Sequence, residues 1–379
     1  MCLIAVVTFS FFTCSSLVRA AKVQAAGGGG AEAEIALPAN GDYSIEYAAD
    51  GKSILVVSGR RLFILSGDGR TRVRSAELAK PYRRLHERKD HYVAITSTTY
   101  EVIDKATLVP ARSINLRCIE AYDLAIHPAR LVSFVSLTEE PPTPLPRMGD
   151  QRIVLIDENT LATKRPAQLY GRWLAMDPEG RRLFAGVSGF VSAPLTLDLE
   201  LPRDLAEADF PLDLLMALNL DDAGGAVQSV SVNPRAGATG RAVRIAPDGK
   251  LISYVSRSGT PPLSHEIPAF DSQAIDRVVA TYAMNEMGDI TDVAFHPTLP
   301  LVAASAQKGV LLFHRETGQR LEARLAFGDA PPTDPRRLFW SPDGRTLLID
   351  VSEGDSRVLR AHPLTLTPAD QQSLRPPPP

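Results

Sequence analysis

The sequence predicts an all-β protein built from repeated four-stranded units, and three observations lead to this fold class. Short apolar segments alternate along the chain with turns rich in Gly, Pro and Asp. The same order of segments and turns recurs roughly every 40–50 residues. No long segment with an apolar period of about 3.6 residues separates the strands, which argues against a fold of alternating strands and helices.

The clearest unit begins at Ile290 and has the sequence ITDVAFHPTLPLVAASAQKGVLLFHRETGQRLEARLAF. Turns divide it into four short segments: Thr291–His296, Leu301–Ala306, Val310–His314 and Arg320–Phe327. Four such segments in succession form an antiparallel meander, and a repeat of this length is typical of a propeller blade. The sequence therefore predicts a seven-bladed β-propeller of four-stranded antiparallel blades.

Each blade is assigned from its first segments. The blades begin near Tyr43, Tyr82, Cys118, Arg172, Ala242, Ile290 and Arg337. Runs such as Ile54–Val57 and Leu347–Ile349 are apolar without alternation, as expected for strands covered on both faces by neighbouring blades. An open or six-bladed ring, with the fourth blade divided differently, is the alternative.

Three further segments complete the predicted ring. Ala33–Pro38 has no place in the first blade, and we expect it to pair as the outer strand of the last blade and close the ring. Glu139–Arg152 and Val191–Ala226 interrupt the repeat and are expected to be surface insertions. The second insertion is expected to hold a short helix over Asp204–Ala208, capped by Asp204. Long insertions on a rigid scaffold are frequent binding sites.

The ends of the chain are expected to lie outside the propeller. Residues 1–25 are apolar and then small, as in a signal peptide, although no Lys or Arg precedes the apolar run. An uncleaved anchor, a misplaced start and a lipoprotein site at Cys14 are the alternatives. Residues 26–32 form a Gly-rich linker, 33–368 the propeller and 369–379 a Pro-rich tail.

Composition limits the function classes. The 379 residues include 41 basic and 44 acidic ones, so the net charge is −3 and no basic field favours general binding of nucleic acid. Outside the N-terminal segment, no apolar run is long enough to span a membrane. Cys2, Cys14 and Cys118 are the three cysteines, and Cys118 is expected to be a small buried core residue. Nucleophile-elbow, zinc-protease and P-loop motifs are absent, so no catalytic residue, metal or cofactor is predicted.

Four residues are candidates for binding: His127, His296, His265 and Glu266. His127 and His296 occupy equivalent positions before a proline in the third and sixth blades. Two imidazoles near the channel mouth would provide bases or metal ligands, but each residue would equally cap the end of its strand by bonding a backbone group. His265 and Glu266 lie in an insertion of the fifth blade.

Other polar and aromatic residues are expected to serve the structure. His86 and His91 flank the charged string HERKDH and are expected to be solvated. The Asp-Gly pairs are predicted to be turn residues; their aspartates are Asp50, Asp68, Asp248 and Asp343. Trp173 and Trp340 are expected to start equivalent strands and to pack between blades.

Several repeats resemble known propeller repeats. IAPDGKLISYVSRSG, from Ile245, and WSPDGRTLLIDVSEGDSRVLR, from Trp340, are similar to the PD40 repeat of TolB- and tricorn-type propellers. IHP at Ile126 and FHP at Phe295 look more like WD40 and YVTN repeats, although the Trp-Asp and Gly-His pairs of WD40 blades are missing. The resemblance covers about 300 residues and implies protein or ligand binding on the faces of the ring.

The sequence thus favours an exported, monomeric, non-catalytic propeller that binds a protein or a component of the cell envelope in the periplasm or outside the cell. The alternative is a lactonase- or hydrolase-type propeller enzyme whose site lies at the central channel. That alternative requires His127 or His296 to converge with carboxylates on the channel.

Overall fold

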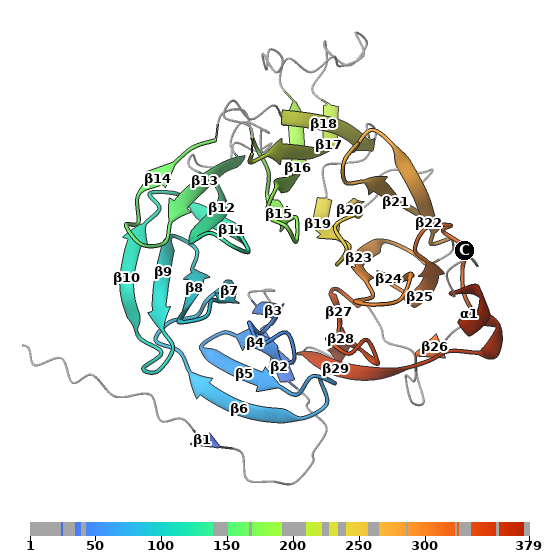
Figure 1. Ribbon diagram of the computed structural model, residues 1–379, viewed down its shortest axis with the longest axis horizontal. Helices are drawn as coiled ribbons and strands as arrows, with labels where there is room; N and C mark the ends of the chain where they lie inside the picture. The colour runs from blue at the N-terminus through green and yellow to red at the C-terminus, as the bar shows by residue number, and fades with distance from the viewer. Residues whose placement is uncertain are drawn as a thin grey trace, which may run out of the picture.

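The computed structural model shows seven antiparallel sheets arranged around one axis, with the chain passing from blade to blade in sequence order (Figure 1). It describes residues 24–25, 35–38, 43–138, 151–166, 169–191, 210–221, 227–233, 240–256, 265–285, 287–322, 324–325, 335–353 and 356–374. The seven-bladed β-propeller predicted from the repeat is confirmed.

The first three blades follow the predicted meander. Blade one contains β3 (Tyr43–Tyr47), β4 (Ile54–Ser58), β5 (Arg61–Leu65) and β6 (Arg72–Glu77), and β1 (Gln24–Ala25) pairs with β6. Blade two contains β7 (Arg84–Glu87), β8 (His91–Ile95), β9 (Thr99–Asp104) and β10 (Pro110–Asn115). Blade three contains β11 (Glu120–Ile126), β12 (Val132–Thr138), β13 (Gln151–Asp157) and β14 (Thr163–Lys164), so the predicted insertion ends before Gln151.

Blade four corrects one prediction. Its strands are β15 (Trp173–Met176), β16 (Arg182–Val191), β17 (Phe210–Asn219) and β18 (Val227–Asn233). The segment Val191–Ala226 was predicted to be a surface insertion, but it contains β17, which is a full strand of the blade. All ten residues of β17 pair with β16, and Leu214, Leu215 and Met216 are buried. The helix predicted at Asp204–Ala208 lies outside the described residues.

Blades five to seven complete the ring. Blade five contains β19 (Gly240–Ile245), β20 (Leu251–Ser256), β21 (Glu266–Asp271) and β22 (Val278–Ala283). Blade six contains β23 (Ile290–Phe295), β24 (Leu301–Ala306) and β25 (Gly309–His314), and a bridge from Phe313 to Arg320 marks its fourth position. Blade seven contains β27 (Leu338–Trp340), β28 (Thr346–Glu353) and β29 (Ser356–Thr365), and the two residues of β26 (Arg324–Leu325) pair with the far end of β29.

The predicted ring closure is confirmed. β2 (Ile35–Leu37) pairs with β29 as the outermost strand of blade seven, and its Ile35 and Leu37 are buried. The hydroxyl of Tyr43 in blade one also donates to Asp350 in blade seven. The start of the propeller is therefore joined to its end both by a strand ladder and by a buried side-chain hydrogen bond.

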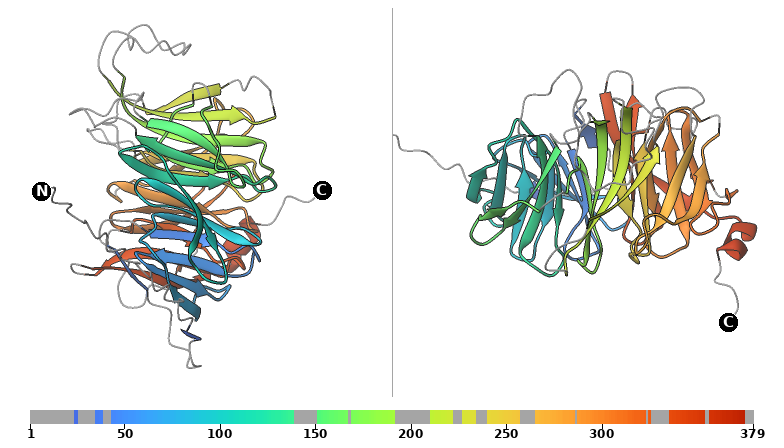
Figure 2. Two further views of the ribbon diagram at one scale, coloured as in Figure 1. Left: turned by 90° about the vertical axis from the view of Figure 1, so that its left-hand side faces the viewer. Right: turned by 90° about the horizontal axis from the view of Figure 1, so that it is seen from above.

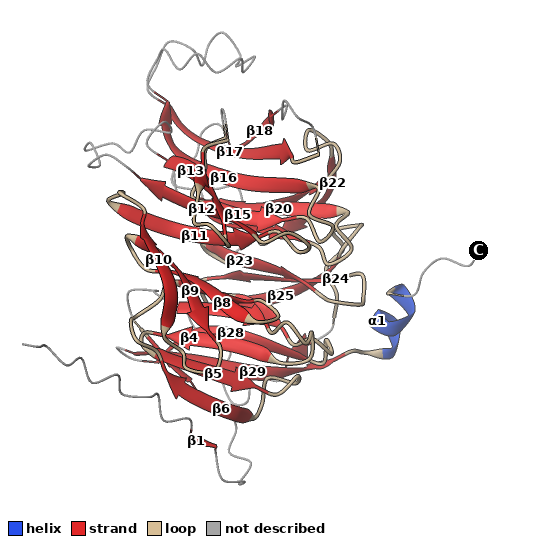
Figure 3. Ribbon diagram, turned by 60° about the vertical axis from the view of Figure 1, so that its left-hand side comes forward, coloured by secondary structure: helices blue, strands red, loops and turns tan. Residues whose placement is uncertain are grey.

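The hydrophobic core lies between the blades. The buried clusters each join neighbouring sheets; for example, Leu55 and Leu62 of blade one pack with Leu85 of blade two. The side views show the sheets stacked face to face around the ring, and the regular secondary structure of the described chain is strand apart from one short helix (Figures 2 and 3). Burial on both faces explains the unbroken apolar runs in the sequence.

One short helix lies at the edge of the ring. α1 (Pro368–Ser373) begins at the cap residue Thr367, whose hydroxyl accepts a hydrogen bond from the N–H of Asp370. Asp370 accepts from the N–H of Glu322, and the buried Leu374 packs into the cluster shared by blades six and seven. The predicted tail boundary at 368 thus divides a segment that packs on the propeller, and residues 375–379 lie outside the described ranges.

Candidate functional site

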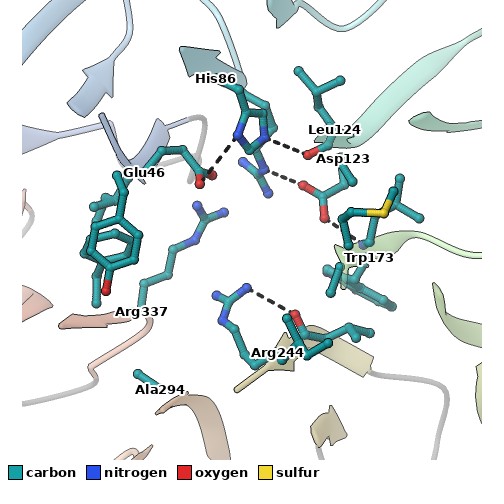
Figure 4. A pocket seen from close by; sticks show the side chains of 18 of the residues that line it. Glu46, His86, Asp123, Leu124, Trp173, Arg244, Ala294 and Arg337 are labelled. Carbon is teal, nitrogen blue, oxygen red and sulfur yellow. Dashed lines mark hydrogen bonds and ion pairs between the residues drawn. The ribbon is translucent and has the colours of Figure 1, made fainter. Parts of the chain in front are cut away.

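A cavity of about 370 Å³ lies on the axis of the ring and is lined by residues of all seven inner strands, β3, β7, β11, β15, β19, β23 and β27. We call it the central cavity. Arg244 of blade five and Arg337 of blade seven extend into it, together with Glu46, His86 and Asp123 (Figure 4). Such a volume suits a ligand the size of one or two side chains.

The inner strands can be aligned by the backbone hydrogen bond that closes the turn after each of them, for example from the N–H of His296 to the carbonyl of Leu301. Four residues before that N–H lies a position that we call the charged layer. It is occupied in blades one to seven by Ser44, Arg84, Asp123, Trp173, Ala242, Asp292 and Arg337. Charged residues fill four of these seven positions, and Arg84, Asp123 and Arg337 among them line the cavity.

An arginine–aspartate pair occurs twice around the ring. Nε of Arg84 in blade two donates to Asp123 in blade three at 2.7 Å, and the other oxygen of Asp123 accepts from the N–H of Leu174 in blade four. Three blades further on, Arg244 in blade five donates to Asp292 in blade six at 3.0 Å.

The second pair repeats the contacts of the first. Asp292 accepts from the N–H of Leu338 in blade seven, as Asp123 does from Leu174. Asp292 is almost fully buried, and its negative charge raises the pKa of Arg244 against the effect of desolvation by burial. Both carboxylates therefore join three consecutive blades, and buried carboxylates of this kind are stable when paired and hydrogen-bonded.

Arg337 has a different environment. Its Nη1 donates to the carbonyl of Tyr43 at 3.0 Å, and Arg84 donates to the same carbonyl oxygen at 3.0 Å. Its guanidinium also lies 4.3 Å from the centre of the Tyr43 ring. No carboxylate of the described residues lies within ion-pair distance of Arg337. Burial, and then the positive charge of Arg84, lowers the pKa of Arg337.

His86 and Glu46 form the other polar pair of the central cavity. The Nε2–H of His86 donates to the carbonyl of Leu124 at 2.8 Å, and its Nδ1 faces the carboxylate of Glu46 at 3.6 Å. The expectation that His86 is solvated is wrong, because its side chain is only 15% exposed. The inner strand β7 was missed because its sequence, RLHE, contains no apolar run and overlaps the charged string HERKDH.

His91 also departs from that expectation. Its Nε2 lies 3.2 Å from Glu158, a fully buried carboxylate that also pairs with Arg88. This network lies between blades two and three rather than on the cavity.

Aromatic side chains line part of the cavity. The rings of Tyr47 and Phe339 lie 4.5 Å apart, and Trp173 packs 6.3 Å from Tyr254. Tyr47 is 40% exposed, and its hydroxyl donates to the carbonyl of Trp340. Trp173 begins β15 whereas Trp340 ends β27, so their predicted equivalence is wrong, while the predicted packing of Trp340 between blades is confirmed by its bond to Ala294 of blade six.

The sequence-predicted histidines lie in turns instead of the central cavity. His296 accepts from the N–H groups of Thr298 and Leu299 through Nδ1 and donates through Nε2 to Gly344. His127 accepts from the turn that follows it in the same manner and bonds the backbone of Gly180. The structure therefore separates both imidazoles from Asp123 and Glu46, and their use for binding stays a prediction.

His265 and Glu266 lie at the start of β21, on the side of blade five away from the inner strand. Glu266 is exposed and His265 is half-buried, and neither lines the central cavity. The residues 257–264 that precede them are outside the described part, so their binding role also stays a prediction.

The predicted turn aspartates and Cys118 can be placed directly. Asp50, Asp68, Asp248 and Asp343 each accept a hydrogen bond from the N–H two residues on, as turn residues do. Cys118 is half-buried, and so less enclosed than expected, and its thiol donates to the carbonyl of Ser97 at 3.8 Å. Within the described ranges, no group of three or more His, Cys, Asp or Glu side chains is placed to hold a metal ion, and no helix has the length and apolar character needed to cross a membrane.

Comparison with known proteins identifies the architecture. No family model matches the chain, and no curated protein matches it in sequence. Among solved structures, the chain is similar to the β-propeller domain of Cps50 (Swd1) from Myceliophteria thermophila, with a TM-score of 0.58 and 12% sequence identity. The match covers 88% of this chain and 98% of that domain. The chain thus has a β-propeller fold.

Proposed function

We propose that this chain is a monomeric, non-catalytic binding propeller that takes a protein or cell-envelope ligand at the central cavity. The observation that carries this proposal is the state of the two aspartates of the charged layer, Asp123 and Asp292. Each oxygen of Asp123 already accepts a hydrogen bond from another blade, and Asp292 is buried with its oxygens bonded to Arg244, Leu338 and Val293. Carboxylates fixed in this way build the ring and are poorly suited to accept a substrate proton.

The distribution of exposed apolar side chains favours the cavity over the outer edge. Among the described residues, the large exposed ones away from the cavity are dispersed over blades one, two, three and five: Val73, Val109, Ile119, Leu131, Val278 and Val279. The exposed aromatic side chain of the described residues, Tyr47, lies instead at the cavity beside Phe339. Aromatic side chains in a concave, partly polar setting are frequent anchors of binding sites.

The test is affinity purification of the tagged full-length protein from its own cell envelope, followed by mass spectrometry. We expect a stoichiometric partner that is lost with Tyr47→Ala and retained with Val278→Ala. Both substitutions truncate an exposed apolar side chain, but Val278 lies on the outer strand β22. A partner retained equally by both variants would place its binding outside the cavity and contradict the proposal.

The enzyme alternative has one structural feature in its favour. Glu46 and His86 are two titratable side chains that face each other within the cavity. Turnover of lactone or ester substrates by the purified protein, abolished by His86→Gln, would replace the binding proposal with this alternative. We favour binding because Nε2 of His86 is engaged with Leu124 and Nδ1 faces Glu46, which leaves no ring nitrogen directed at a substrate.

We also propose that the chain is exported, as the apolar N-terminal segment suggests, to the periplasm or the medium, or held at the membrane if that segment is not cleaved. Cell fractionation with N-terminal sequencing of the mature protein tests this. A cytosolic protein that retains Met1 would contradict export.

A further inference from the structure

We propose that the central cavity binds a carboxylate carried on an apolar or aromatic group, with Arg337 as its principal contact. The inference rests on the proposed binding function and specifies the chemistry of the ligand. It concerns the one cationic side chain of the cavity that has no carboxylate partner among the described residues.

The pattern of ion pairs around the ring shows what Arg337 lacks. Arg84 in blade two pairs with Asp123 in blade three, and Arg244 in blade five pairs with Asp292 in blade six. In each case the carboxylate is supplied by the next blade. The blade that follows Arg337 is blade one, and its residue in the charged layer is the neutral Ser44.

Ser44 makes the same contact with the backbone of the next blade as the two aspartates do, but it carries no charge. Its hydroxyl lies 3.5 Å from the N–H of Leu85 in blade two, as Asp123 accepts from Leu174 and Asp292 accepts from Leu338. Serine can therefore bridge adjacent strands, but it cannot neutralise a guanidinium. A ligand carboxylate would provide the missing charge.

The contacts of Arg337 leave donors for such a ligand. A guanidinium has five N–H groups, and one nitrogen of Arg337 is bonded to the carbonyl of Tyr43. Arg84 donates to that same oxygen, so two cations converge on one neutral acceptor. Figure 4 shows the Arg337 side chain extending into the cavity toward Glu46 and His86. An arginine in this position can form the paired hydrogen bonds that a planar carboxylate accepts.

The surroundings limit the ligand to one negative charge with an apolar body. Glu46 also lines the cavity, with 30% of its side chain exposed, and would repel a dianion. Tyr47, Phe339 and Trp173 provide aromatic surface for the remainder of the ligand. A cavity of about 370 Å³ holds a group the size of an acidic side chain or a small aromatic acid.

Calorimetric titration of the full-length protein tests this with three probes of similar shape: phenylacetate, its neutral amide phenylacetamide, and phenyl phosphate. We expect phenylacetate to bind at least about ten times more tightly than phenylacetamide, because a charge-assisted hydrogen bond is stronger than a neutral one. Phenyl phosphate should bind more weakly than phenylacetate. Tighter binding of phenyl phosphate would overturn the assignment to a carboxylate.

Variants locate the contact. Arg337→Gln should weaken phenylacetate binding about ten- to hundred-fold, and Arg337→Lys should weaken it less, because it keeps the charge but loses the planar pair of donors. Arg345→Gln, on an exposed turn of the same blade, should bind as the wild type does. Near-ultraviolet circular dichroism confirms that each variant is folded, and the comparison of acid with amide holds even if Arg337→Gln does not fold.

Equal affinity for phenylacetate and phenylacetamide, or unchanged binding in a folded Arg337→Gln or Arg337→Lys variant, would overturn the inference. A different result would contradict the proposed function, namely a partner from the envelope that Tyr47→Ala and Val278→Ala retain equally. The two failures are therefore separable.

Discussion

The Nε2–H of His296 in blade six donates to the backbone carbonyl of Gly344 in blade seven at 2.8 Å. Nδ1 of the same ring accepts from two N–H groups of its own turn, so the imidazole is neutral with its proton on Nε2. His127 and Gly180 repeat this relationship between blades three and four. Equivalent residues of the repeat thus join one blade to the next through their turns.

Gly344→Ala should lower the free energy of unfolding by about 2–4 kcal/mol, because two costs add. Its φ of +71° is strained for alanine, and an added Cβ would overlap the ring of His296. Gly51→Ala is the matched control, since Gly51 has φ of +63° in the corresponding turn of blade one with no atom within 4 Å of the added Cβ. Urea unfolding should show that Gly51→Ala lowers the free energy of unfolding by about 1 kcal/mol. Equal losses in the two variants would show that the contact with the imidazole has no role.

The pH dependence of stability should reveal His296. Burial lowers its pKa from 6.5 to about 4, so between these values the unfolded state binds a proton that the folded state does not. This contribution is complete above pH 6.5 and is lost as the pH falls, by about 2 kcal/mol at pH 5. In His296→Asn, the difference in unfolding free energy between pH 7.5 and 5 should shrink by that amount. His314→Asn, on β25 of the same blade, should keep the wild-type difference.

Glu158→Ala should destabilise the protein by about 3–5 kcal/mol, since it leaves the buried guanidinium of Arg88 without its carboxylate. Ser133 also donates to Glu158, so a second polar group would lose its partner. The exposed pair of Arg60 and Glu77 provides the control, and Glu77→Ala should change the unfolding free energy by less than about 1 kcal/mol. A small effect of Glu158→Ala in chemical denaturation would show that the network contributes little.

Closure of the ring can be tested at β2. Ile35 is 2% exposed against the cluster formed by blades seven and one, and Ile35→Ala should cost about 2–4 kcal/mol. Ala36 between the two buried residues points outward, and Ala36→Ser should be close to neutral. Limited proteolysis should cleave the Ile35→Ala variant faster than the control. Equal protease resistance would mean that β2 is dispensable for closure.

Much of the fold could be predicted because its signals are local. The turns of Pro-Asp-Gly and His-Pro type marked the ends of inner strands, and the apolar runs of β4 and β28 reported burial on both faces. Where a local signal was weak, the prediction was wrong. β7, with the sequence RLHE, was hidden in a charged string, and β17 was assigned to an insertion because Pro211 and Asp213 interrupt its apolar run.

The candidate site could be predicted only in outline. The central channel was predicted as one possible location, but the histidines proposed for it lie in turns. No sequence signal indicated that Arg84 pairs with Asp123. None indicated that the blade after Arg337 would offer the neutral Ser44 in place of a carboxylate. Aligning the inner strands by the residues before each turn would have placed Arg84, Asp123, Asp292 and Arg337 in one layer. It would not have shown which of them form pairs, because the distance between side chains of neighbouring blades is set by how the blades pack in the ring.

By itself, the sequence determined the repeated antiparallel sheets of a propeller and predicted its closure by the N-terminal strand, because strand period, turn chemistry and apolar burial are all properties of short segments. The number of blades, for which an open or six-bladed ring was the alternative, was decided by the tertiary structure. The tertiary structure alone decided which charges meet. Residues as distant as Tyr43 and Arg337 become neighbours only when the last blade packs against the first, and the balance of charge in the central cavity follows from that closure.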